Sequence, residues 1–410
     1  MLSLEFQYLI TKTSISNIII SNSAVLAWEQ RKLGEVAEIV GGGTPSTNIS
    51  KYWNGNINWY SPTEIGSQTF VNSSKKKITE LGLKESSAKL LPGKKTILFT
   101  SRAGIGDMAI MNTDGSTNQG FQSWIVKPDI TDIYFLYSLG CNLKKQALRK
   151  ASGSTFLEIS NSEVKKLSLY LPDFKEQTII GKIIQLIDKI ITLQQRKLSE
   201  LINLRLGILH AVFDNNKSNK KQIILSELGT TYSGLTNKTK TDFGHGAAHY
   251  VTYINVNKNP IADPREIANI EIDTNQNSVK KGDIFFTISS ETPEEVGLTS
   301  VWPINIQNTY LNSFCFGFRP YSNKIDSFYL GYLFRSDYFR RKIYPLAQGI
   351  SRYNLSKNNV LKLMIKVDSL EKQYKIKKIL LNIDFKIKKE KEKINKVKQL
   401  KQFLLQNMFI

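Results

Sequence analysis

Two long segments of this chain carry the same apolar pattern. Residues 175–213 read KEQTIIGKIIQLIDKIITLQQRKLSELINLRLGILHAVF, and residues 371–410 read EKQYKIKKILLNIDFKIKKEKEKINKVKQLKQFLLQNMFI. In both, apolar residues recur at spacings of three and four over about four heptads, which is the pattern of a coiled-coil helix. The pattern predicts two long helices, which we expect to pair with each other as an antiparallel coiled coil.

The residues expected to form the contact seam occupy the a and d positions of these heptads. In the first helix they are Ile180, Ile184, Ile187, Ile191, Leu198, Leu201 and Ile208, and in the second they are Ile376, Leu380, Ile383, Ile387, Ile394, Val397 and Leu404. Polar residues interrupt both seams at matching places, Gln194 with Glu390 and Arg205 with Lys401. Such residues usually fix the register of a helix pair at some cost in stability. The alternative is that each helix packs on its own domain as ordinary core.

The likeness between the two halves extends upstream of the helices. The offset of 196 residues that aligns Gly153 with Gly349 holds without a gap to the end of the chain. Further upstream the register slips, but residues 33–42 still resemble residues 225–234, and residues 91–100 resemble residues 279–287. The chain is therefore predicted to be one unit used twice.

The repeat predicts the domain organisation. A leader covers residues 1–27, and it lacks the positive n-region of a signal peptide. The predicted segments that follow are a globular part at 28–174, a helix at 175–213, a polar linker at 214–221, a second globular part at 222–370 and a helix at 371–410.

Each globular part is expected to be an α+β domain built around a curved sheet. Short runs rich in β-branched and aromatic residues predict strands at 97–100, 123–126, 166–171, 284–287 and 314–318. Apolar residues at helical spacing predict helices at 133–148 and 327–343.

The charge of the chain favours a polyanionic partner. Its 56 Lys and Arg against 35 Asp and Glu give a formal net charge of +21, which suits nucleic acid or an anionic membrane surface. With two cysteines, Cys141 and Cys315, and three histidines, the chain is expected to have no disulfide framework and no CxxC-type zinc site, so a reducing compartment such as the cytoplasm is expected. No run of about 18 apolar residues is present, so no membrane-spanning helix is expected.

No group of residues predicts a catalytic centre. The glycine-rich residues 41–45 lack the strand, helix and downstream acid of a dinucleotide-binding site, and the Pro-Gly-Lys-Lys-Thr at 92–96 lacks the glycine spacing of a P-loop. Both are expected to be turns. His245 and His249 have the i,i+4 spacing of metal ligands but no third ligand nearby. Ser101 has no histidine or paired carboxylate within reach in the sequence. We therefore predict that the chain is not an enzyme and holds no metal.

Basic residues, in contrast, cluster beside aromatic residues and glycines. Arginine can bind a guanine edge through two hydrogen bonds, whereas lysine mostly neutralises phosphate. Any one of them is more simply a solvated surface residue, but as a set in two tethered domains they favour duplex binding. The candidate DNA-binding residues are Lys75, Lys76, Lys77, Lys94, Lys95, Arg102, Arg149, Lys150, Lys238, Lys240, Lys280, Lys281, Arg340, Arg341, Lys342, Arg352 and Tyr353, and Arg335 belongs to the same clusters.

Several stretches together resemble the DNA specificity subunit of type I restriction–modification systems. They are WEQRKLGEV at 28–36, NQGF at 118–121, Gly153-Ser154-Thr155-Phe156 followed by Leu171-Pro172 and Glu176-Gln177, and KQLKQFLLQNMFI at 398–410. The resemblance covers the chain from Trp28 onward. The second half departs from it, because Gly349-Ile350-Ser351-Arg352-Tyr353 replaces the Gly-Ser-Thr-Phe motif.

The resemblance implies two target-recognition domains in tandem, each followed by a helical spacer, with the spacers paired antiparallel. Each domain would read one half of a split, asymmetric site in double-stranded DNA. The helices would dock two methyltransferase subunits, which bind S-adenosylmethionine. Restriction subunits, which use ATP and Mg, would complete the assembly, and this chain itself would be non-catalytic and hold no cofactor.

Two other interpretations remain open at this point. One is a stand-alone nucleic-acid-binding coiled-coil protein whose charge serves RNA. The other is the specificity module of a different methyltransferase or nuclease assembly. A single-chain methyltransferase or nuclease is disfavoured, because the chain lacks a glycine-rich cofactor loop and an acidic metal cluster.

Overall fold

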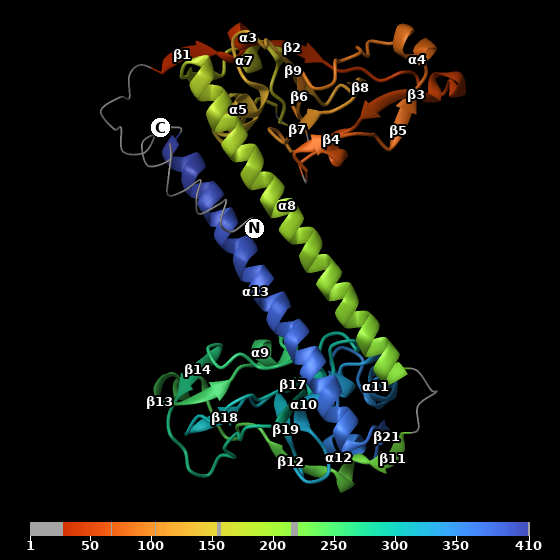
Figure 1. The fold of residues 1–410 in the computed structure, drawn as a ribbon, viewed down its shortest axis with the longest axis vertical. Coiled ribbons are helices and arrows are strands. Elements are labelled where there is room, and N and C mark those ends of the chain that lie inside the picture. The colour runs from red at the N-terminus through yellow and green to blue at the C-terminus, as the bar shows by residue number, and fades with distance from the viewer. Residues whose placement is uncertain (1–27, 67, 103, 154–156, 215–219, 409–410) are drawn as a thin grey trace. The chain divides into compact units, whose positions relative to one another are not determined.

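The computed structural model describes residues 28–408, apart from residues 67, 103, 154–156 and 215–219 (Figure 1). The predicted leader, most of the predicted linker and three residues of the Gly-Ser-Thr-Phe motif therefore lie outside the described residues. The chain divides into two compact units. Unit 1 runs up to Leu193 and includes the chain from Ile394 onward, and unit 2 comprises Gln194–Lys393. Each unit thus contains one globular part and a portion of each long helix.

Unit 1 contains a larger and a smaller sheet. The larger one has the strand order β2 (Ala37–Gly41), β9 (Gln122–Val126), β6 (Thr96–Phe99), β7 (Met108–Met111) and β4 (Phe70–Val71). The smaller one has the order β5 (Lys76–Ile78), β3 (Trp53–Tyr60) and β8 (Gly115–Thr117). The short helices are α3 (Leu33–Val36), α4 (Glu80–Lys84), α5 (Ile133–Ser138), α6 (Gly140–Lys150) and α7 (Asn161–Lys165). Phe99 stacks on Trp124 in the core, with ring centroids 4.8 Å apart.

Unit 2 repeats this plan with four strands in its larger sheet. That sheet has the order β12 (Gly229–Ser233), β19 (Cys315–Pro320), β15 (Ile284–Thr287) and β17 (Thr299–Val301). The smaller sheet has the order β14 (Ile267–Ile270), β13 (Phe243–Val251) and β18 (Thr309–Leu311). The short helices are α9 (Tyr253–Lys258), α10 (Ser327–Phe334), α11 (Asp337–Ile343) and α12 (Lys357–Leu361). Phe286 stacks on Phe316 at 4.9 Å between centroids.

Each globular part closes on itself through its first and last strands. In unit 1, β1 (Glu29–Lys32) pairs antiparallel with β10 (Ser168–Leu171). In unit 2, β11 (Lys221–Ile224) pairs antiparallel with β21 (Met364–Val367). The chain thus leaves each globular part beside the place where it entered and continues directly into a long helix.

The predicted strands are present, but each predicted short helix is divided in two. The region 133–148 forms α5 and α6, and the region 327–343 forms α10 and α11. A serine lies at each break: Ser138 is the last residue of α5, and Ser336 is the N-cap of α11, where the backbone is extended and the hydroxyl accepts from the Phe339 backbone. The Ser138 hydroxyl donates to the Phe135 carbonyl oxygen, and the Ser336 hydroxyl donates to the Leu333 carbonyl oxygen, both at 2.6 Å. Such back-bonding competes with the helix ladder.

The two long helices are α8 (Phe174–Leu209) and α13 (Leu370–Met408), and α8 is followed by a π-helical turn at His210–Asp214. In unit 2, Lys197 pairs with Glu390 at 3.1 Å while Arg205 pairs with Asp384 at 2.6 Å. Residue numbers therefore rise along α8 as they fall along α13, so the helices pair antiparallel, as predicted (Figure 1). Every residue of both expected seams is buried or half-buried.

The seam is also where each helix joins its globular part. In unit 1, Ile180, Ile184 and Ile187 share one core cluster with Phe135 of α5 and with Leu404 of α13. In unit 2, Leu380 belongs to the cluster that contains Tyr329 and Leu330 of α10. The two interpretations of the stripes are thus both realised, because one stripe faces the partner helix and the domain together.

Two aspartates connect these three elements. Asp188 accepts hydrogen bonds from the Tyr134 hydroxyl at 2.7 Å and from the Lys401 ammonium at 2.5 Å. Asp384 accepts them from the Tyr332 hydroxyl at 2.7 Å and from Nε of Arg205 at 2.6 Å. The offset of 196 relates Asp188 to Asp384 and Arg205 to Lys401, so the arrangement is the same in each unit. Three of the polar interruptions, Arg205, Lys401 and Glu390, therefore have partners across the seam, whereas the side-chain oxygen of Gln194 is buried without a hydrogen-bond partner among the described residues.

A buried glutamine fixes the start of each long helix. Gln177 accepts hydrogen bonds from the Thr131 hydroxyl and the Asp132 backbone, and Gln373 accepts one from the Asp326 backbone. Both glutamine side chains are at least 98% buried. Among the described residues no helix is both long enough and apolar enough to cross a membrane.

Replacing Asp384 with alanine should lower the free energy of unfolding by about 2–4 kcal/mol, because it leaves a largely buried Arg205 without its carboxylate. The side chains of Arg205 and Asp384 are only 15% and 22% exposed. The measurement is the urea midpoint of the full chain by circular dichroism. Glu371→Ala is the matched control, since its pair with Lys375 is exposed and should change stability by less than about 0.5 kcal/mol. Equal effects of the two substitutions would contradict the role given to Asp384.

Candidate nucleic-acid interface

The candidate basic residues lie at three places, of which the second and third correspond in the two units. The first place is the small sheet, where Lys75, Lys76 and Lys77 lie at β5 in unit 1, whereas Lys238 and Lys240 lie in the loop before β13 in unit 2. The second is the turn before β6 or β15. The third is a hairpin before α7 or α12.

The small sheet supports a surface that we call the loop face. In unit 2 it consists of the loop 236–242 before β13 and the turn 312–314 after β18. In unit 1 it consists of the loop 44–50 before β3 and the turn 118–120 after β8. Each loop is placed by one backbone hydrogen bond, from Leu235 to Leu311 in unit 2 and from Gly43 to Thr117 in unit 1, both 2.8 Å.

Matching asparagines shape the second part of each loop face. The Asn312 side chain accepts from the Phe314 backbone at 2.8 Å, and Asn118 accepts from the Gly120 backbone at 2.9 Å. The Asn312 backbone donates to Val251, and the Asn118 backbone donates to Tyr60. The two units thus present the same backbone at these turns.

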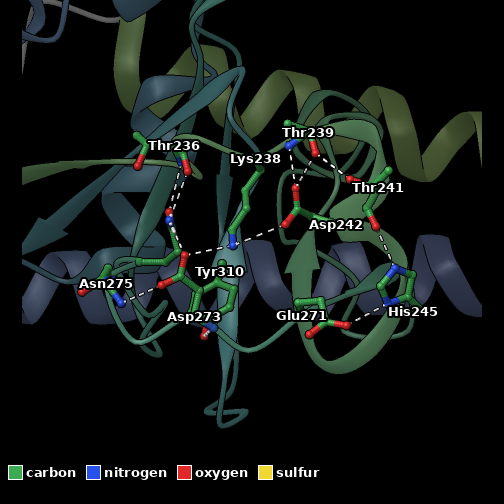
Figure 2. Close-up of polar contacts among 11 residues, drawn as sticks. Thr236, Lys238, Thr239, Thr241, Asp242, His245, Glu271, Asp273, Asn275 and Tyr310 are labelled. Atoms are coloured by element: carbon green, nitrogen blue, oxygen red, sulfur yellow. Dashed lines mark hydrogen bonds and ion pairs between the residues drawn. The ribbon is translucent and has the colours of Figure 1, made fainter.

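Ion pairs and hydrogen bonds fix the conformation of the loop 236–242 in unit 2 (Figure 2). Lys238 pairs with Asp273 at 2.9 Å and with Asp242 at 3.8 Å. Asp242 also accepts from the backbone and hydroxyl of Thr239 at 2.7 and 2.8 Å. Hydrogen bonds from Gln276 and Lys238 lower the pKa of Asp273 to about 2, so this carboxylate remains ionised at neutral pH. The Lys238 ammonium is therefore paired within unit 2, and its side chain is only 12% exposed.

Beside this loop the surface is hollowed. The hollow has a volume of about 460 Å³, and its walls include Asn237, Lys240, Asn312, Ser313 and Phe314. Phe243 and Tyr250 also line it, with their rings edge to face at 5.2 Å between centroids. Phe314 is 54% exposed at its rim. Lys238 also lines the hollow, and of all its lining residues only Lys238 and Lys240 were predicted from the sequence. Asn312 could have been found by aligning its turn with the Asn-Gln-Gly-Phe stretch at 118–121 of the first repeat.

The second place carries exposed lysines on a tight turn. Lys94 and Lys95 precede β6, and Lys280 and Lys281 precede β15, and all four are exposed. Lys94 has a positive φ of 60°, which marks the turn. The Pro-Gly-Lys-Lys-Thr stretch is thus a turn, as expected.

The third place is a hairpin that the two units share. In unit 2 the backbones of Gln348 and Asn354 exchange hydrogen bonds of 3.0 and 2.7 Å, and in unit 1 those of Ser152 and Glu158 exchange bonds of 2.9 and 3.0 Å. A Cβ on Gly349, whose φ is 139°, would lie 1.9 Å from the Arg352 carbonyl oxygen, so this motif position requires glycine.

The hairpins gather several candidate residues. Arg352 is exposed and Tyr353 is half-buried on the hairpin of unit 2, whose tip residue Ile350 is 99% exposed. In unit 1 the exposed Arg149 and Lys150 end α6 just before the hairpin, and Arg102 pairs with Glu158 at 2.7 Å.

The structure corrects the expectation for Arg340. This side chain is 6% exposed, and it donates to the backbone carbonyl oxygens of Glu294 and Val296 at 2.9 and 2.7 Å. It therefore supports the domain interior and cannot reach a phosphate. Arg335 is half-buried, and it donates to the carbonyl oxygens of Thr299, Val256 and Asn257. The neighbouring Arg341 is exposed and pairs with Asp214, while Lys342 is half-buried over the Tyr338 ring.

The other motifs have structural roles. A Cβ on Gly42 would lie 1.9 Å from the Asn118 carbonyl oxygen, so the glycine-rich stretch at 41–45 serves close backbone packing. His245 contacts Glu271 and the Thr241 carbonyl oxygen (Figure 2). His249 contacts Asn269. Within the described residues, no group of three or more His, Cys, Asp or Glu side chains could hold a metal ion.

Comparison with known proteins gives a consistent result. MjaIX, a type I restriction enzyme specificity subunit of Methanocaldococcus jannaschii, is 35% identical over 178 residues, 43% of this chain and 41% of that protein. The EcoR124I/EcoR124II specificity subunit of Escherichia coli is 32% identical over 172 residues, 40% of this chain and 41% of that protein. Each match therefore spans less than half of the curated relative.

Solved structures share the fold over nearly the whole chain. The type I S subunit of M. genitalium superposes with a TM-score of 0.64 at 17% identity and covers 94% of this chain and 97% of that chain. A chain from a structural study of type I R-M complex assembly and conformational transition gives 0.54 at 16% identity, over 93% and 97%.

One family model matches the chain twice. The model for the type I restriction modification DNA specificity domain covers residues 26–203 and residues 217–399. Each match contains one globular part and most of the helix that follows it, which agrees with the repeat of 196 residues. The chain therefore belongs to the type I restriction modification DNA specificity family and contains two copies of its domain in tandem.

Proposed function

We propose that this chain is the sequence-specific DNA-binding subunit of a type I restriction–modification complex, and that each unit reads one half of a split site. One observation carries the proposal. The two units place loops on the same backbone frame but with different exposed side chains, for example Gln119 in unit 1 and Ser313 in unit 2. Two units that share a backbone but expose different side chains are suited to bind a DNA site whose two halves differ in sequence.

The helix pair would act as the spacer between the two readers. A helix of about 36 residues is about 54 Å long at 1.5 Å per residue, which exceeds one duplex turn of about 34 Å. The half-sites would therefore be separated by several base pairs that are not read. The same helices would dock two methyltransferase subunits and, with them, restriction subunits.

In this proposal the chain is non-catalytic and the chemistry belongs to its partners. S-adenosylmethionine would bind to the methyltransferase subunits, and ATP and Mg to the restriction subunits. The cytoplasm, where the chromosome of a prokaryotic cell lies, is the proposed location.

The proposal is tested by selecting random duplexes on the purified full chain, alone and with its methyltransferase subunits, and sequencing those retained. We expect two short motifs at one fixed spacing. Competition between duplex DNA and RNA over a salt series provides the control, because both bind by counterion release but only a base reader keeps a specificity ratio. Equal retention of RNA and unrelated DNA would instead support a general polyanion-binding protein.

The spacer can be lengthened without breaking the helix pair. One heptad inserted after Leu193 and one after Lys393 should add about 10.5 Å to both helices and widen the gap by about three base pairs. Both half-site sequences should remain the same, as measured by the same selection. A variant that altered the bases read, with the gap unchanged, would contradict the spacer role.

A set of lysines on α13 should contribute charge and no base recognition. Lys386, Lys389, Lys393 and Lys396 are exposed and make no ion pair within the described residues. Changing all four to glutamine should weaken assembly or flatten the dependence of binding on salt, by up to about 0.9 in the log–log slope for each phosphate that is no longer neutralised. Arginine at the same positions is the control and should preserve both properties. A changed recognition sequence in the glutamine variant would count against this role.

A further inference from the structure

The loop face of unit 2 has polar groups that its own structure does not use. Among the described residues, the side chains of Asn237, Lys240 and Ser313 make no hydrogen bond or ion pair, and all three are exposed. Asn312 uses its carbonyl oxygen on the Phe314 backbone, and its amide group is left to donate. These groups converge on the same hollow of about 460 Å³.

The backbone that carries these groups is fixed in advance. Asp242 holds the start of the 3₁₀ turn through Thr239, and Gln276 bonds both the N–H and the carbonyl oxygen of Thr236 at 3.0 and 3.1 Å. An ion pair between Lys238 and Asp273 connects the loop to the segment that follows β14 (Figure 2). Because the loop is already ordered, little conformational entropy would be lost when it contacts a ligand.

The unused groups match the chemistry of a base edge. An amide can donate and accept at once, as adenine requires, and a serine hydroxyl can serve either role. The exposed ring of Phe314 offers an apolar contact of the kind made with a thymine methyl group. Lys240 supplies one uncommitted positive charge, which suits a phosphate.

The repeat gives an independent reason to assign specificity here. The loop face of unit 1 has the same backbone bonds, but its exposed side chains are Ser46, Thr47, Asn48 and Gln119. Gln119 and Ser313 each follow the matching asparagine directly, so they hold the same position with different reach and polarity. The two loop faces therefore share their backbone conformation and differ in their exposed side chains, as recognition of two different half-sites requires.

We propose that the loop face of unit 2 reads the bases of one half-site, with Asn237 and Ser313 contacting base edges and Lys240 contacting a phosphate. This inference rests on the proposed function and deepens it. It assigns a different task to Lys238, which orders the loop and does not contact DNA.

The test uses the full chain and the duplex selected for it, together with all single-base variants of that duplex, in an anisotropy assay. Asn237→Ala should relax discrimination about 10- to 100-fold at one base pair of one half-site and leave the other half-site unaffected. Ser313→Gln, which introduces the residue of unit 1, should change the preferred base within the same half-site. Lys240→Ala should weaken binding to all duplexes and lower the salt slope by about one.

Lys258→Ala is the matched control. This exposed lysine ends α9, which follows the far end of β13, and its removal should leave both affinity pattern and salt slope as in the wild type. The side chains at Ser313, Lys240 and Lys258 are exposed, so those three variants should unfold at the wild-type temperature. Asn237 has a positive φ of 57°, which alanine adopts less readily, so Asn237→Ala should lower the unfolding temperature slightly, and the unfolding curve separates this effect from a lost base contact. If the wild type selects a split motif but neither Asn237→Ala nor Ser313→Gln shifts any base preference, this inference is overturned and the proposed function stands. A wild type that selects no motif would overturn the proposed function as well.

Discussion

The fold of each unit depends on one aspartate that bonds to two partners. Asp384 holds the hydroxyl of Tyr332 from the globular part and the guanidinium of Arg205 from the opposite helix, and Asp188 does the same with Tyr134 and Lys401. A carboxylate in this position needs both partners, because a largely buried charge without them costs several kcal/mol. The apolar seam alone could slide by a heptad, whereas these two polar contacts allow one register. Helix pairing and domain attachment are therefore one event in each unit.

The parts of the fold that sequence reasoning predicted are those with a long periodic signal. The seam of α8 and α13 repeats over several heptads, and the repeat offset of 196 could be checked over tens of residues. The break between α10 and α11 was missed, because apolar spacing continues through it while Ser336 adopts an extended backbone and caps the start of α11. A single capping serine leaves little trace in the pattern of apolar residues.

The candidate site was harder to predict, because the charge of a residue does not show whether its side chain is buried or already paired within the protein. Arg340 was expected to contact DNA, but its helix turns it inward onto two backbone carbonyl oxygens. Lys238 forms an ion pair with Asp273, which lies 35 residues away in the sequence and comes close only in the folded protein. Uncharged residues such as Asn237 and Ser313 gave no signal of their own. Their position became apparent when the loop faces of the two units were compared on one backbone frame.

The central claim is that two units of one design each read their own half of a single site. The most direct measurement is methylome sequencing of cells that carry this chain with its methyltransferase subunits, before and after residues 28–174 are exchanged for those of a relative with another specificity. The account predicts a split methylated motif in which the exchange changes one half and leaves the other half and the gap intact. A change in both halves, or a continuous motif, would contradict it.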